Sequence, residues 1–236
     1  MTEEPKAVYE QIGVAMTCRS FQEYVDMFQL TSAMLAHGPI LDVAAGAASF
    51  CAEAQQKGLQ TTAVDPLYTL LPETIQAHGE RETKAATEKL VKLADVYDWD
   101  YYGSPAAHEE NRLRSLEFFV ADYQKDQQHQ RYVRGELPSL PFADNAFSLV
   151  LCSHFLFLYH DQFDLPFHLN AVRELIRVCK PGGQIRIYPL ATFARERYPE
   201  LNQLLDTLKT EGVDVELMPT SFRFLRGATH VLRITK

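Results

Sequence analysis

Two aspartates in the first third of the chain frame a stretch of very small residues. Asp42 follows an apolar run and leads into Val-Ala-Ala-Gly-Ala-Ala, and Asp65 ends a second apolar run further along. Small residues let a ligand approach the backbone closely, and a carboxylate at the end of the next strand can accept hydrogen bonds from both hydroxyls of a ribose. The spacing predicts a β-α-β unit that holds a nucleoside.

The elements that must position these residues can be read from the hydrophobic pattern. It predicts a strand over 40–43, a helix over 48–57 and a strand over 60–64. After residue 130, strand and helix patterns alternate to the end of the chain. We expect further strands near 131–133, 147–152, 185–188, 213–218 and 229–235, and further helices over 165–179 and 198–211. Such alternation is typical of a largely parallel sheet with helices on both faces.

Residues 67–130 form an insertion that is longer than a crossover helix with its loops requires. Two helical stripes fill it, with the aromatic run 97–102 between them. The insertion leaves the strand that ends at Asp65, so it starts on the ligand side of the sheet. We predict a helical lid over the site, with Trp99 and Tyr101 on its inner surface. The alternative is that these aromatic side chains only attach the lid to the rest of the domain.

The remaining segments and the composition fit one domain over residues 1–236. Residues 1–38 are predicted to form N-terminal helices over the site, because apolar residues recur at helical spacing between 6 and 37. Gly13 and the stretch Thr17–Ser20 are expected to split this segment into two helices. The chain has 236 residues, of which 46% are hydrophobic, enough for a large core. Its net charge is −8 with no basic block, which argues against a nucleic-acid partner.

Several other functions are disfavoured by the sequence. No apolar run is long enough to span a membrane, and no signal peptide is visible, so we expect a cytoplasmic protein. The scattered cysteines Cys18, Cys51, Cys152 and Cys179 form no Cys-x-x-Cys pair and are expected to be free thiols. No histidine pairs with carboxylates or cysteines at a ligand spacing, so no metal site is predicted. The sequence does not indicate an oligomeric state.

Three motifs in order resemble the class I methyltransferases that use S-adenosylmethionine (SAM), a Rossmann-like family. The first is the loop 42–48, where the family has an acid and three alternating glycines and this chain keeps the middle one, Gly46. The second is Leu-Pro-Ser-Leu-Pro-Phe over 137–142, preceded by Gly135-Glu136 and followed by an Asp-Asn turn and an apolar strand. The third is Lys-Pro-Gly-Gly over 180–183. The resemblance implies a seven-stranded, mostly parallel sheet with an antiparallel last strand and SAM as cofactor.

The resemblance also implies roles for individual residues. Asp42, Ala44 and Gly46 would line the methionine and ribose part of SAM, and Asp65 would accept from the ribose hydroxyls. The residues expected around the adenine are Pro66, Leu67, Glu136 and Leu137. Ser153 would face the transferred methyl group from the end of the fourth predicted strand. Arg19 is expected to pair with the SAM carboxylate, with a surface ion pair as the alternative.

The residues expected around a small-molecule substrate are less firmly placed by the sequence. They are Tyr9, Tyr24, Trp99, Tyr101, His154 and Tyr159. His154 is the candidate general base, which a hydroxyl acceptor needs more than an amine does; the alternative is that it only shapes the pocket. Arg112 and Arg114, on the second helical stripe of the insertion, are expected on a solvated helix face; the alternative is that they meet an acidic substrate from the lid. An oxygen or nitrogen acceptor is favoured over carbon.

Two other functions stay open. Ala44 stands where the family has a glycine, and alanine would be strained there if the backbone needs a positive φ. A SAM-binding protein with weak or no catalysis is therefore one alternative. A nucleotide-dependent oxidoreductase is the other, although Gly-x-Gly-x-x-Gly is absent.

Overall fold

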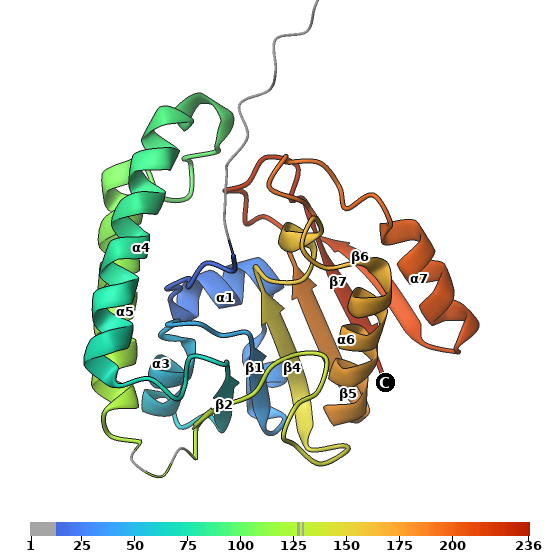
Figure 1. Ribbon diagram of the computed structural model, residues 1–236. Coiled ribbons are helices and arrows are strands. Elements are labelled where there is room, and N and C mark those ends of the chain that lie inside the picture. Colours follow the sequence, from blue (N-terminus) through green and yellow to red (C-terminus); the bar gives the residue numbers. More distant parts are fainter. Residues whose placement is uncertain (1–12, 127, 129) are drawn as a thin grey trace, which may run out of the picture.

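The computed structural model describes residues 13–126, 128 and 130–236, and its centre is a seven-stranded sheet with the order β3-β2-β1-β4-β5-β7-β6 (Figure 1). Strands β1 to β5 are parallel, whereas β7 is antiparallel to both of its neighbours. This confirms the predicted fold class. The strands are β1 (Ile40–Val43), β2 (Thr61–Val64), β3 (Tyr132–Val133), β4 (Phe147–Ser153), β5 (Cys179–Tyr188), β6 (Asp214–Pro219) and β7 (His230–Thr235).

Helices cover both faces of the sheet because its central strands are apolar on both sides. Every residue of β1 and β4 is buried, as expected for parallel strands between two helical layers. The helices α6 (Leu165–Val178) and α7 (Leu201–Thr210) pack on one face. The helices α1 (Phe21–Phe28), α2 (Ser32–Ala36) and α3 (Phe50–Gln56) supply the core of the opposite face.

The insertion forms a helical hairpin, which we define as residues 72–123. It consists of α4 (Pro72–Lys92), a short 3-10 turn η1 (Ala94–Val96) and α5 (Pro105–Tyr123). Its helices begin where the sequence offers start signals. Proline occupies the first turn of both, and the Ser104 hydroxyl accepts from the Ala107 N–H at 3.1 Å.

The hairpin is attached to the rest of the domain at both ends. Its base packs through α5 against α3, beside the β3 edge of the sheet (Figure 1). At its tip, the Asp98 N–H donates to the Phe224 carbonyl at 3.0 Å, and Tyr97 forms a bridge with Leu225. The hairpin therefore stands along one side of the sheet and reaches over the ends of the parallel strands.

The N-terminal segment has the predicted break at Thr17–Ser20, but this break also includes residues 14–16. Within the described residues, helix begins only at Phe21, and residues 14–20 are not helical. The backbone of this stretch bonds to other parts of the chain: the Thr17 carbonyl accepts from Ala47 N at 3.2 Å, and the Arg19 carbonyl accepts from Ser49 N at 2.9 Å. Carbonyls used in this way cannot serve a helical ladder. We call residues 14–19 the N-terminal strap.

Candidate active site

The residues predicted to hold the cofactor meet where the parallel strands end. Most of them line one cavity of about 250 Å³, which we call the cofactor cavity. Its wall includes the predicted residues Ala44, Gly46, Asp65, Pro66, Leu67, Glu136 and Leu137. The loops after β1, β2 and β3 supply them, because strands of one direction bring their carboxyl ends to the same edge of a sheet.

Asp65 is held in place by backbone N–H groups on two sides. Its carboxylate accepts from Gly46 N and from Leu67 N, both at 2.9 Å. The side chain is buried, and burial raises the pKa of its carboxyl group, although the two N–H groups oppose the shift, so that the pKa is about 6. A carboxylate fixed at the end of β2 suits a pair of ribose hydroxyls.

The loop after β1 contains two residues with a left-handed backbone. Ala44 has a φ of 54° and Gly46 a φ of 57°. Alanine at a positive φ is strained by roughly 1 kcal/mol. The structure therefore confirms that the backbone at Ala44 needs a positive φ, the condition under which strain was expected. A Cβ at Gly46 would lie only 3.0 Å from the Thr17 carbonyl oxygen, so glycine is needed where the N-terminal strap crosses the loop.

Asp42 lies beneath this loop rather than on the cavity wall. It is buried, accepts from the Tyr24 hydroxyl at 3.1 Å, and its Oδ2 atom has no hydrogen-bond partner within the described residues. Burial raises the pKa of its carboxyl group well above the usual value, and the charge of Asp65 adds to the shift. Burial therefore favours the protonated form of Asp42.

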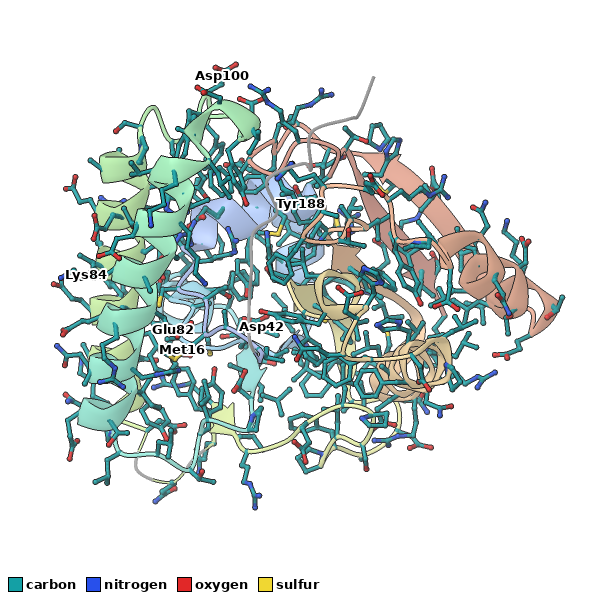
Figure 2. All side chains as sticks on the ribbon, turned by 45° about the horizontal axis from the view of Figure 1, so that its top comes forward. Met16, Asp42, Glu82, Lys84, Asp100 and Tyr188 are labelled. Carbon is teal, nitrogen blue, oxygen red and sulfur yellow. The ribbon has the colours of Figure 1, made fainter. Side chains whose placement is uncertain are left out.

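A second cavity of about 130 Å³ adjoins the first, and we call it the acceptor cavity. The strap, α4, the hairpin tip and the loops after β4, β5 and β6 form its wall. The two cavities share Ala15, Met16, Thr17 and His154. Figure 2 shows Met16 and Glu82 between the hairpin and the sheet, and Lys84 on the outer side of α4. The inner side of the hairpin thus closes the acceptor cavity.

His154 occupies the shared wall in a left-handed conformation, with a φ of 52°. Its backbone N–H donates to the Tyr188 carbonyl at 2.7 Å, and its Nδ1 atom lies 2.9 Å from the Ser153 hydroxyl. Burial lowers the pKa of the imidazole well below its usual value, and the positive charges of Arg19 and Arg112 lower it further. The ring is therefore neutral at neutral pH.

The other predicted residues are distributed unevenly. Tyr159 and Arg19 line the acceptor cavity, so the structure does not bring Arg19 to the wall of the cofactor cavity. Tyr24 and Ser153 are buried behind the two cavities and line neither. Tyr9 lies outside the described residues. The roles of these residues in binding stay predictions.

The aromatic run of the hairpin tip packs mainly against the protein. Trp99 donates from Nε1 to the Ala94 carbonyl at 2.8 Å and packs edge-on against Phe224. Tyr101 donates to Asp26 at 2.8 Å. Neither residue is on the wall of the acceptor cavity, whereas Tyr97 is. The contacts of Trp99 and Tyr101 thus match the alternative in which they attach the hairpin to the domain.

A buried charged cluster was not foreseen from the sequence. Glu23 of α1 is fully buried and forms ion pairs with Arg19 and with Arg112, which lies 6% exposed on α5. Burial alone would raise the pKa of Glu23, but Arg112 and Arg19 lower it to about 2. The expectation of a solvated helix face was therefore wrong for Arg112. Helical spacing could not reveal this, because the partner comes from a distant segment.

The strap and three phenylalanines are further wall residues that the sequence reasoning missed. Phe155, Phe163 and Phe167 line the cofactor cavity; Phe163 and Phe167 stack on each other, and Phe155 packs edge-on against both. These phenylalanines recur around the start of α6, and this pattern could have indicated from the sequence that they share one apolar wall. The sequence predicted only a break between helices at the strap, because its position across the β1 loop depends on contacts with a distant segment.

Known proteins resemble this chain at the level of family and fold. Residues 106–187 match a family described as "Methyltransferase domain". An uncharacterized protein of Methanocaldococcus jannaschii is 31% identical over 219 residues, which cover 92% of this chain and 94% of that protein. The chain belongs to the class I SAM-dependent methyltransferase family. Its cofactor is accordingly SAM.

Other similar methyltransferases share less of the chain. A ubiquinone/menaquinone biosynthesis C-methyltransferase of Legionella pneumophila is 36% identical over 62 residues, 26% of this chain and 22% of that protein. A solved TehB-like SAM-dependent methyltransferase of Corynebacterium glutamicum is 14% identical, with a TM-score of 0.46, over 84% of this chain and 80% of that one.

The site of this methyltransferase fits SAM on its own geometry. The cofactor cavity combines a carboxylate at the end of β2, an acid at Glu136, apolar walls from Pro66 and Leu137, and the left-handed β1 loop. Over the described part of the chain, no group of His, Cys, Asp and Glu is arranged to hold a metal ion. In the same part, no helix is long and apolar enough to cross a membrane.

Proposed function

We propose that this methyltransferase transfers the methyl group of SAM to an oxygen or nitrogen atom of a small molecule held in the acceptor cavity. The observation that carries the proposal is the wall shared by the two cavities, formed by Ala15, Met16, Thr17 and His154. A cofactor and an acceptor on the two sides of this wall would meet beside His154.

The chemistry needs alignment and a dry site more than it needs functional groups. Methyl transfer is an in-line displacement in which the positive charge of the sulfonium disappears, so exclusion of water favours it. The hairpin and the strap enclose the acceptor cavity from two sides. We propose that the hairpin and the strap act as the lid. A covered pocket is better suited to a small-molecule acceptor than to an acceptor on the surface of another protein.

A hydroxyl acceptor would also require removal of a proton. The Ser153 hydroxyl lies within 3.6 Å of Met27 Sδ, to which it can donate, so its oxygen is free to accept from Nδ1–H of His154. In that tautomer the Nε2 atom of His154 carries the lone pair of a base. The low pKa of the ring keeps Nε2 unprotonated at neutral pH, and it also makes the ring a weaker base than a free imidazole.

Binding is the first test. The purified protein is titrated calorimetrically with S-adenosylhomocysteine (SAH), then SAM, then NADH. We expect micromolar affinity for the first two and no measurable heat from NADH. A screen of small hydroxyl and amine acceptors for SAH release then tests the transfer itself. Binding of NADH in place of SAM would contradict the proposal and favour an oxidoreductase.

A SAM-binding protein without turnover is the second candidate, and the strained Ala44 favours it. It predicts SAM binding without methyl transfer to any acceptor, and a tighter complex in the Ala44→Gly variant. The screen separates the two, because release of SAH that depends on an added acceptor excludes a purely regulatory protein.

A further inference from the structure

The buried charged cluster beside the acceptor cavity contains more positive than negative charge. Arg19 and Arg112 share one carboxylate, that of Glu23, and all three side chains are buried. Arg112 takes the close contact, whereas Arg19 Nη1 lies 3.4 Å from Glu23 and 3.5 Å from the Tyr102 hydroxyl. The second guanidinium charge is therefore only weakly compensated, and an uncompensated buried charge is costly.

Two N–H donors at this cavity lack a partner among the described residues. One is Arg19 Nε. The other is His108 Nδ1: its Nε2 atom accepts from Arg112 Nε at 3.2 Å, which places the ring proton on Nδ1. Burial lowers the pKa of His108 to about 2, and Arg112 and Arg19 contribute, so the ring stays neutral. Both residues line the acceptor cavity, and such buried donors are normally satisfied.

The rest of the wall is mostly apolar, with Leu90, Leu158, Phe193 and Phe224 among its members. Among the residues on this wall, Glu82 is the one carboxylate, and it is partly exposed on α4, where water can solvate it. The volume of about 130 Å³ is below the roughly 300–1,000 Å³ of pockets for drug-sized ligands. An occupant must be small and largely apolar.

We propose that the acceptor is a small carboxylic acid, and that Arg19 and His108 receive its carboxylate. A carboxylate supplies the missing negative charge and two acceptor oxygens, and a charged hydrogen bond to arginine is stronger than a neutral one. This inference rests on the proposed function and names the class of its substrate. An acceptor whose only charge is positive would be repelled by the same cluster.

The test uses pairs of probes that differ only in charge. Protein saturated with SAH is titrated with benzoate, phenylacetate and hexanoate, and with the neutral amide of each. We expect at least one acid to bind at least tenfold more tightly than its amide. Arg19→Gln should abolish this difference, and Arg19→Lys should retain part of it. Arg173→Gln, which removes an exposed ion pair with Glu211, is the matched control and should change nothing.

Each other outcome contradicts either the inference or the proposed function on which it rests. Equal binding of acids and amides, or binding of none of the acids up to 20 mM (about the weakest affinity such a titration detects), means that the cavity does not select a carboxylate. If Arg19→Gln weakens SAH binding instead, the carboxylate recognised is that of the cofactor. Failure of the parent protein to bind SAH at all contradicts the proposed function, not the charge argument.

Discussion

The cofactor cavity and the acceptor cavity adjoin each other, yet the chain builds them by different means. The wall of the cofactor cavity comes mainly from loops that directly follow parallel strands, so the sheet fixes its shape. The acceptor cavity is lined by the strap, the hairpin and the segment around Phe224, which are far apart in sequence and are held together by contacts between distant segments. Cofactor binding and acceptor binding should therefore respond separately to mutation.

The largest effect is expected where the hairpin is joined to the domain. Glu23→Ala would leave Arg19 and Arg112 buried without their carboxylate, and we expect the free energy of unfolding to fall by about 3–5 kcal/mol. Urea unfolding followed by circular dichroism measures this. Glu211→Ala, at an exposed ion pair, is the control and should leave the midpoint unchanged. A loss below about 1 kcal/mol would mean that the cluster does not stabilise the domain.

The next largest effect is expected on turnover, from a substitution in the wall that the two cavities share. His154→Ala should lower turnover by about 100-fold or more, since a general base contributes that much, while SAH affinity stays nearly constant because other residues make the cofactor cavity. Steady-state rates with an acceptor from the screen and SAH calorimetry measure the two quantities. An equal loss in both would assign His154 a structural role.

Asp65 tests the cofactor cavity alone. Asp65→Ala should lower SAM affinity at least tenfold, because it removes charged hydrogen bonds worth about 1.5–3 kcal/mol. Calorimetry measures the affinity, and Asp144→Ala, an exposed carboxylate paired with Arg177, is the control. Unchanged affinity in a folded Asp65→Ala variant would refute the ribose assignment.

The raised pKa of Asp65 predicts that its contribution to stability falls, and that SAH affinity rises, as the pH increases. The folded protein holds this proton up to a pH of about 6, above the unfolded value, so its contribution to stability is lost as the pH rises through 6. Ribose hydroxyls donate to the ionised form, so SAH affinity should rise about tenfold between pH 5 and pH 7. Asp65→Asn should remove the rise, even though His78 and Glu136 also line the cavity. A rise that persists in Asp65→Asn would come from another group.

The smallest effect concerns the strained loop. Ala44→Gly should raise the free energy of unfolding by about 0.5–1 kcal/mol, because glycine adopts a positive φ without steric cost but loses more chain entropy. Thermal unfolding with and without SAH measures it. Ala45→Gly, at a neighbour without a positive φ, should destabilise the protein and thereby show that the gain is specific to the left-handed position.

The same comparison explains what the sequence could predict. The strand ends, the acid Asp65 and the left-handed strain at Ala44 follow from local patterns, because parallel strands place their ends together whatever the rest of the chain does. The start of α5 at Ser104 was equally readable, since a cap acts over one turn. Local patterns suffice wherever the determining contacts are close in sequence.

The acceptor side was less predictable for a physical reason. The burial of Arg112 depends on Glu23, and the placement of Trp99 and Tyr101 depends on Phe224 and Asp26. Each of these contacts joins segments that helical periodicity treats separately. The sequence predicted a break between two helices where the strap lies, but not that the carbonyls of the strap bond to the loop and helix that follow β1.

Glu23 also has a consequence for how the domain opens. The same carboxylate accepts from Ser20 N at 2.8 Å, which completes the capping box of α1, and it pairs with Arg112 of α5. Detaching the hairpin therefore removes Arg112, the counter-charge of Glu23 in the first turn of α1. Conversely, fraying of α1 takes Glu23 away from Arg112. In native-state hydrogen exchange the two helices should behave as one cooperative unit, with amides that exchange together.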